Sequence, residues 1–181
     1  MSVLFTGRAR RLGDDIDTDT IIQSRRKRET LDPAELKRYL MEAWDPAFAA
    51  TVEAGDILVA GRNFGCGSAM EVAVTVVLGA GIRAVVAKSF ARTYFRNAIN
   101  NGLLPVICDT AGIDDGETIE IAAAEDGLRV RGLASGFTAA AEPLPPAVRG
   151  IVEAGGLVAY LKRHGDFQTA APAANTIADQ P

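Results

Sequence analysis

Residues 56–68 read DILVAGRNFGCGS. The apolar run at 57–60 predicts a short buried strand, and the stretch at 69–79 predicts a helix. The glycines between them allow backbone conformations that other residues avoid, so they predict a flexible loop. A strand that continues through such a loop into a helix is typical of an α/β fold. We expect the loop to place Ser68 at the start of the helix.

The alternation of strand and helix continues downstream. Residues 83–87 and 103–107 predict two more buried strands, with a helix at 89–100 between them. Strands joined by helices pair in parallel, and the helices pack on the sheet. Outside this unit we expect a strand at 3–12, a hairpin of 117–122 and 127–132, and helices at 32–43 and 145–163, the last interrupted near Gly155.

The composition bounds the kind of protein. The chain has 181 residues, 48% of them hydrophobic, which suits one domain with a sizeable core. We place this domain at residues 1–164 and expect residues 165–181 to form a disordered tail. The net charge of −4 argues against general nucleic-acid binding. No apolar stretch predicts a membrane span or a signal peptide. Two cysteines give no disulfide framework, so the expected location is the cytoplasm.

Metal-binding residues are scarce. One histidine, His164, and two cysteines, Cys66 and Cys108, exclude a histidine triad and a His/Cys zinc site. An iron–sulfur cluster needs about four ligands, so another chain would have to bring any such metal. The acidic run at 14–19 lacks the glycine and distal glutamate of a calcium loop. We therefore interpret the acidic run as a turn in which the carboxylates accept hydrogen bonds from backbone amides.

Two roles fit Ser68. A helix N-terminus presents unpaired N–H groups and positive potential, which suit an anion or a serine alkoxide. Serine is also a preferred helix N-cap, which explains the same position structurally. The loop matches neither the P-loop nor the G-x-G-x-x-G pattern, so a nucleotide site is not supported. The residues alone leave both roles open.

A basic cluster at 25–28 is the other candidate for ligand binding. It predicts either a solvated face or a loop that closes over a di- or tricarboxylate, since arginine binds carboxylate oxygens bidentately. Arg92 stands at a strand-to-helix junction and could contribute to the same site.

Four ordered motifs lie at 13–22, 56–68, 87–92 and 96–103. Together they resemble the small subunits of 3-isopropylmalate dehydratase, the swivelling-domain partners in the aconitase superfamily. The resemblance implies an α/β, swivelling-domain-like β/β/α fold with a partly parallel sheet flanked by helices.

The resemblance also implies a hydro-lyase that is active only with its large subunit, in leucine biosynthesis. In this superfamily a [4Fe–4S] cluster on the large subunit acts as Lewis acid on the substrate hydroxyl and carboxylate. No cofactor is then expected on this chain. The small subunit's serine removes a proton beside a carboxylate, and Ser68 holds that position. Asp19 and Arg25 match the first motif and the substrate-recognition loop that follows it.

The chain departs from the family pattern Gly-Ser-Ser-Arg-Glu-His at Ala69 and Met70, where the family has a serine and an arginine that contact a carboxylate. Alternative functions are therefore a hydro-lyase for citramalate, dimethylmalate or homoaconitate, or a non-catalytic assembly or anion-binding subunit. Around a catalytic Ser68 we expect these substrate-binding residues: Asp19, Arg25, Arg26, Gly67, Ala69, Met70 and Arg92.

Overall fold

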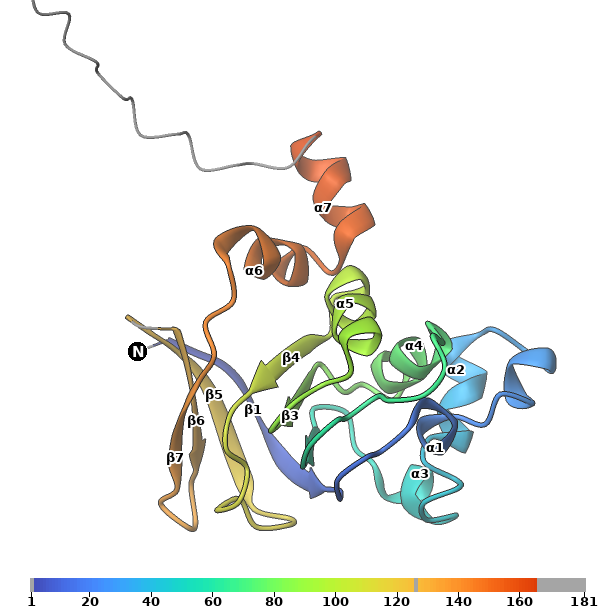
Figure 1. The fold of residues 1–181 in the computed structure, drawn as a ribbon, viewed down its shortest axis with the longest axis horizontal. Helices are drawn as coiled ribbons and strands as arrows, with labels where there is room; N and C mark the ends of the chain where they lie inside the picture. Colours follow the sequence, from blue (N-terminus) through green and yellow to red (C-terminus); the bar gives the residue numbers. More distant parts are fainter. Residues whose placement is uncertain (1, 126, 166–181) are drawn as a thin grey trace, which may run out of the picture.

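The computed structural model describes residues 2–125 and 127–165, and within them seven strands form one sheet (Figure 1). The strands are β1 (Ser2–Arg11), β2 (Ile57–Ala60), β3 (Ala84–Ala87), β4 (Leu104–Ile107), β5 (Thr118–Ala124), β6 (Gly127–Gly132) and β7 (Thr138–Ala141). The helices are α1 (Thr18–Ile21), α2 (Pro33–Leu36), α3 (Phe48–Thr51), α4 (Val72–Gly79), α5 (Arg92–Asn101), α6 (Pro146–Glu153) and α7 (Leu157–His164). Two 3-10 turns are η1 (Arg26–Arg28) and η2 (Lys37–Tyr39).

The sheet has a parallel half and an antiparallel half, in the order β4-β3-β2-β1-β5-β6-β7. Strands β1 to β4 pair in parallel, and β5 to β7 continue antiparallel from the other edge of β1. Strand β1 belongs to both halves, because residues 2–8 pair with β5 and residues 9–11 pair with β2. The predicted partly parallel sheet is confirmed.

The two faces of the parallel strands bury different partners. Leu58 and Val85 point into a core formed with α1, α2 and α4, whereas the alternate residues Val59 and Val86 pack with Ile119 of the antiparallel half. Side chains alternate across a strand, so one short apolar run serves both cores. Figure 1 shows β5 to β7 on one side of the parallel strands and α1 to α4 on the other. The layers are those of the predicted β/β/α fold.

Several predicted helices have different bounds. The helix expected at 32–43 consists only of α2 and η2, because the chain then turns to bury Leu40 and Met41 completely. The helix expected from residue 69 begins at Val72, and the one expected from residue 89 begins at Arg92. In both places the preceding residues form loop hydrogen bonds instead, from Met70 N–H to the Ser68 carbonyl and from Ala91 N–H to the Phe64 carbonyl.

The C-terminal region agrees with its prediction. The helical stretch is interrupted at Gly155 and Gly156, both with positive φ, which separate α6 from α7. The sequence did not predict α1, α3 or β7. Apart from Gly165, the tail expected at 165–181 lies outside the described residues. None of the helices in the described ranges has the length and apolar character needed to cross a membrane.

Candidate active site

Three loops meet at the carboxyl ends of β1, β2 and β3. The loop after β2 bonds to the other two: Gly61 N–H donates to the Gly13 carbonyl (3.1 Å), Gly65 N–H donates to the Ile16 carbonyl (2.7 Å), and Phe64 N–H donates to the Ser89 carbonyl (3.0 Å). The carboxyl edge of parallel strands is where α/β proteins commonly bind ligands. The glycine-rich segment is thus the middle of a three-loop surface.

Aromatic rings form the floor under this surface. Phe64 makes edge contacts with Phe90 (5.9 Å between centroids) and Tyr94 (5.1 Å). Gly65 has a φ of +77°, and a side chain there would overlap the Tyr94 ring. Tyr94 is buried, and its hydroxyl donates to the Ala73 carbonyl at 3.4 Å. Glycine is therefore required at position 65 both by conformation and by space.

The acidic loop is held by hydrogen bonds. Asp14 accepts from the backbone N–H of Arg62 (2.7 Å) and pairs with its guanidinium (3.2 Å); these contacts lower the pKa of Asp14. Asp15 accepts from the Asn63 amide (2.8 Å). In the described part of the chain, no group of three or more His, Cys, Asp or Glu residues is arranged to hold a metal ion. The acidic run thus forms hydrogen-bonded turns.

Ser68 lies on the exposed part of the loop, four residues before α4. Glu71 occupies the N-cap position, without a capping side-chain bond. The interpretation of Ser68 as a helix cap is therefore wrong, and so is its expected place at the helix start. Its carbonyl accepts hydrogen bonds from Met70 N–H (2.8 Å) and from the Thr18 hydroxyl (3.0 Å). Its own hydroxyl forms no hydrogen bond within the described residues.

Comparison with known proteins assigns this arrangement to a family. Residues 16–111 match the aconitase C-terminal domain. The chain is 48% identical to 3-isopropylmalate dehydratase small subunit 1 of Methanopyrus kandleri, over 91% of this chain and 96% of that protein. The chain belongs to the aconitase C-terminal domain family.

Two further relatives narrow the position within the aconitase family. The methanogen homoaconitase small subunit of Methanocaldococcus jannaschii is 45% identical, over 92% of this chain and 96% of that protein. The crystal structure of 3-isopropylmalate dehydratase from the same organism superposes with a TM-score of 0.83 at 45% identity, covering 89% of this chain and 95% of that one. These matches confirm the resemblance to hydro-lyase small subunits.

Within this aconitase-family loop, Gly67, Ser68 and Ala69 are exposed, whereas Met70 is only 6% exposed. The Met70 side chain belongs to the same core as Phe64 and therefore lies away from the surface that presents Ser68. The apolar Met70 side chain is thus accommodated by the core.

In the basic loop at 25–28, Arg26 is held by contacts within the fold, whereas Arg25 is exposed. Arg26 donates from Nε and Nη2 to the two carboxylate oxygens of Glu42, each at 2.9 Å, and its guanidinium carbon lies 3.8 Å from the Tyr39 ring centroid. Arg25 is exposed. Asp19 accepts from Ser24 N–H at 2.9 Å, which closes the turn that begins the loop. Arg26 is therefore a structural cross-link, and Arg25 is available to a ligand.

Arg92 is exposed at the first position of α5. The preceding residue, Ala91, donates its N–H to the Phe64 carbonyl (2.9 Å), which attaches the start of α5 to the glycine-rich loop. This bond places Arg92 beside the loop and explains why α5 begins later than predicted.

The thiols do not form a cluster site. Burial raises the pKa of Cys108 to about 12, and burial and nearby Asp17 raise the pKa of Cys66. Cys66 and Cys108 are only two thiols, whereas an iron–sulfur cluster needs about four ligands. An iron–sulfur group does not fit the donor set of the described residues.

Two residues that hold the site were missed by sequence reasoning. Thr18 contacts the Ser68 carbonyl from 50 residues away, and Glu42 holds Arg26 from 16 residues away. Thr18 stands inside the motif at 13–22. Its place in a motif indicates that the residue matters, but it does not indicate which residue Thr18 contacts. Glu42 has no local signal.

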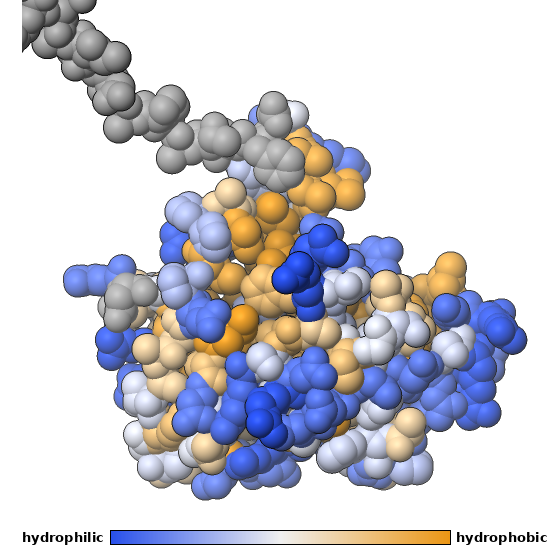
Figure 2. All heavy atoms as spheres, viewed as in Figure 1, coloured by the Kyte–Doolittle hydropathy of each residue, from blue (hydrophilic) through white to orange (hydrophobic). Residues whose placement is uncertain are grey.

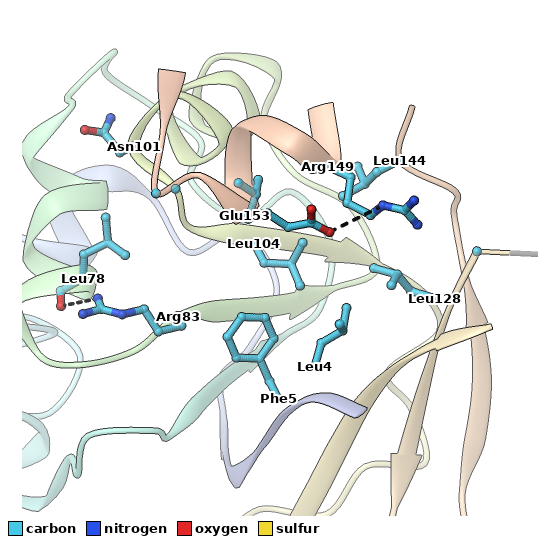
Figure 3. Close-up of a pocket in the computed structure, with 14 residues that line it drawn as sticks. Leu4, Phe5, Leu78, Arg83, Asn101, Leu104, Leu128, Leu144, Arg149 and Glu153 are labelled. Atoms are coloured by element: carbon cyan, nitrogen blue, oxygen red, sulfur yellow. Dashed lines mark hydrogen bonds and ion pairs between the residues drawn. The ribbon is translucent and has the colours of Figure 1, made fainter. Parts of the chain in front are cut away.

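A cavity of about 510 Å³ lies at the opposite end of the parallel strands (Figure 3). It is lined by Leu104 at the amino end of β4, by Arg83 just before β3, and by Val152 of α6. Figure 2 shows hydrophobic surface gathered beside α6 and α7. The cavity is remote from the loop that carries Ser68, so it takes no part in the candidate active site.

Proposed function

We propose that this chain is the small subunit of a 3-isopropylmalate dehydratase-type hydro-lyase and acts together with a large subunit in the cytoplasm. The observation that carries the proposal is the state of Ser68: its backbone is held from two sides, while its hydroxyl is exposed and unbonded among the described residues. The hydroxyl is therefore free to contact a substrate. The names of the relatives support the same reaction class.

In the proposed reaction Ser68 removes the proton on the carbon beside a carboxylate of a small di- or tricarboxylate. Its deprotonated oxygen needs nearby donors, and the backbone N–H groups of the surrounding loop can supply them. Exposed Arg25 and Arg92 bind substrate carboxylates, and Asp19 fixes the turn that presents Arg25. Gly67 and Ala69 bring the loop backbone close to the substrate.

The large subunit would hold a [4Fe–4S] cluster, which supplies the Lewis acid for the departing hydroxyl group. The donor set of this chain supports that division, because Cys66 and Cys108 are only two thiols and a cluster needs about four ligands. The small subunit then provides the base and the carboxylate contacts, and the substrate is enclosed between the two proteins.

The decisive experiment is Ser68→Ala in the reconstituted pair of subunits. Removal of a catalytic base should lower kcat by about 10²–10⁴-fold. Ser2→Ala, an exposed serine at the start of β1, serves as the matched control and should keep full activity. Full activity in the Ser68→Ala pair would remove this residue as the base.

A related substrate is the second candidate. The relative named as a homoaconitase small subunit and the replacement of the family's Ser-Arg by Ala69 and Met70 both favour it. Turnover of 3-isopropylmalate, citramalate, dimethylmalate and homoaconitate by the same pair distinguishes the candidates through kcat/KM. If none is turned over by a correctly assembled, cluster-loaded pair, the chain is instead a non-catalytic assembly or anion-binding subunit.

A further inference from the structure

Thr18 lies directly beneath the loop that carries Ser68. It is the first residue of α1 and is only 2% exposed. Its backbone N–H donates to the Cys66 carbonyl at 2.8 Å, and its hydroxyl donates to the Ser68 carbonyl at 3.0 Å. One buried residue therefore holds the carbonyl groups of both neighbours of Gly67, Cys66 and Ser68.

The backbone at Gly67 makes this double contact possible. Its φ is +88°, and a side-chain carbon at this position would lie 3.5 Å from the Thr18 hydroxyl oxygen. The left-handed turn thus curls around Thr18, so that the carbonyls of Cys66 and Ser68 point to the same residue. Glycine adopts this φ with little strain.

The Ser68 carbonyl is also held from its other side. Met70 N–H donates to it at 2.8 Å, and the Met70 side chain is anchored in the core. With its carbonyl bonded to both Thr18 and Met70, the Ser68 backbone has one orientation, and the direction of its Cα–Cβ bond follows. The Ser68 hydroxyl is left free to meet a substrate.

We infer that Thr18 is a positioning residue for Ser68: its hydroxyl sets the direction in which the Ser68 side chain is presented, without touching the substrate. This inference rests on the proposed role of Ser68 as the base. Proton transfer depends steeply on geometry, and a displacement of about 1 Å can cost about 10²-fold in rate. A single neutral hydrogen bond contributes far less to folding.

The test compares Thr18→Val with Thr18→Ser in the reconstituted pair. Valine keeps the shape of threonine and removes the hydroxyl, while serine keeps the hydroxyl and removes a methyl group. We expect Thr18→Val to lower kcat by about tenfold or more and to leave KM within about twofold of the native value. Thr18→Ser, which keeps the hydroxyl, should retain most of the native kcat. The melting temperature of Thr18→Val should fall by only about 2–4 °C.

Thr110 provides a matched control. It is also buried (4% exposed), and its hydroxyl also donates to a carbonyl 50 residues away, that of Ala60, at 2.9 Å. Thr110→Val should lower the melting temperature by a similar amount and leave kcat within about twofold. An equal loss of kcat in both valine variants, or no rescue by Thr18→Ser, would show that Thr18 is merely structural.

Failure of the inference is separable from failure of the proposed function. If Ser68→Ala keeps full activity, Ser68 is not the base and the proposed function fails. If Ser68→Ala is inactive or slow while Thr18→Val is fully active, only the positioning role fails. In the Ser68→Ala background, adding Thr18→Val should change the residual rate by less than about twofold, because the two residues act as one unit. A further tenfold loss there would overturn the inference.

Discussion

Arg26 and Glu42 form a bidentate ion pair, with Nε to Oε1 and Nη2 to Oε2 both at 2.9 Å. Their side chains are 19% and 17% exposed, so water screens the pair only partly. The guanidinium also stacks on Tyr39 and lies 3.2 Å from a carboxylate oxygen of Glu29. The pair attaches the basic loop to the chain that follows η2, which gives the loop a defined shape beside the candidate site.

Glu42→Gln should therefore destabilise the protein in a pH-dependent way. The hydrogen bond from Arg26 holds the pKa of Glu42 below its ordinary value of 4.5. A carboxyl group with a lowered pKa contributes stability above its unfolded-state pKa and loses it as the pH falls through the folded-state pKa. Urea unfolding should show a deficit of about 1–3 kcal/mol at pH 7 that shrinks below pH 4 or so. An equal deficit at pH 7 and below about pH 4 would contradict a role for the ionised Glu42 carboxylate.

Met70 should behave as a core residue. Met70→Ala removes buried side-chain volume and should cost about 2–4 kcal/mol in the free energy of unfolding, whereas Met70→Leu should cost less than about 1.5 kcal/mol. We also expect a lower kcat in the alanine variant, because the Ser68 loop loses its anchor, and near-native kcat in the leucine variant. Unchanged stability in Met70→Ala would show that the side chain lies on the surface instead.

The strands and the glycine-rich loop could be predicted because their signals are local. Apolar runs of strand length and glycines at the turns act within a few residues of the elements they form. The start of α4 could not be predicted, because the turn at residues 68–70 depends on Thr18, 50 residues away. The break after η2 depends on the burial of Leu40 and Met41, which the helical spacing alone did not reveal.

The candidate site follows the same division. The position of Ser68 in an exposed loop after β2 came from the motif, and the structure replaced the expected helix cap by a free hydroxyl. The difference between Arg25 and Arg26 could not come from a run of basic residues. It arises because Glu42 forms its hydrogen bonds and ion pair with Arg26, whereas Arg25 acts on Glu42 only through its charge. An ion pair between residues distant in the sequence thus decides which arginine of the basic cluster at 25–28 is available to a ligand.

Gly65 should tolerate no side chain. Its φ is +77°, and an added methyl group would overlap the buried Tyr94 ring. Gly65→Ala should therefore abolish activity and cost more than about 3 kcal/mol in the free energy of unfolding. Gly116 is the control: its φ is +80° but the space around it is open, so Gly116→Ala should cost only about 1–2 kcal/mol and leave kcat near native. Equal costs for the two would mean that backbone strain alone matters.

Asp56 joins the start of β2 to β1, and its substitution should destabilise the fold more than substitution of an exposed charge such as Glu153. It is 3% exposed and accepts hydrogen bonds from Arg8 (2.8 and 3.1 Å) and Arg10 (3.3 Å). Burial alone would raise the pKa of Asp56, but these bonds and one from the Glu53 backbone outweigh it and hold the pKa below 3.8.

Asp56→Asn leaves two guanidinium groups without their shared counter-charge, so we expect a loss of about 2–4 kcal/mol at pH 7 by urea unfolding. Glu153→Gln, which breaks an exposed pair with Arg149 at 3.6 Å, should cost less than about 1 kcal/mol. Because the Asp56 pKa is lowered on folding, its contribution is present above about pH 4 and is lost as the pH falls through the folded-state value. The difference between native protein and Asp56→Asn should accordingly narrow in acid. If the two substitutions cost the same at pH 7, burial does not strengthen the Asp56 cluster, and β1 and β2 are held together by their backbone and apolar contacts alone.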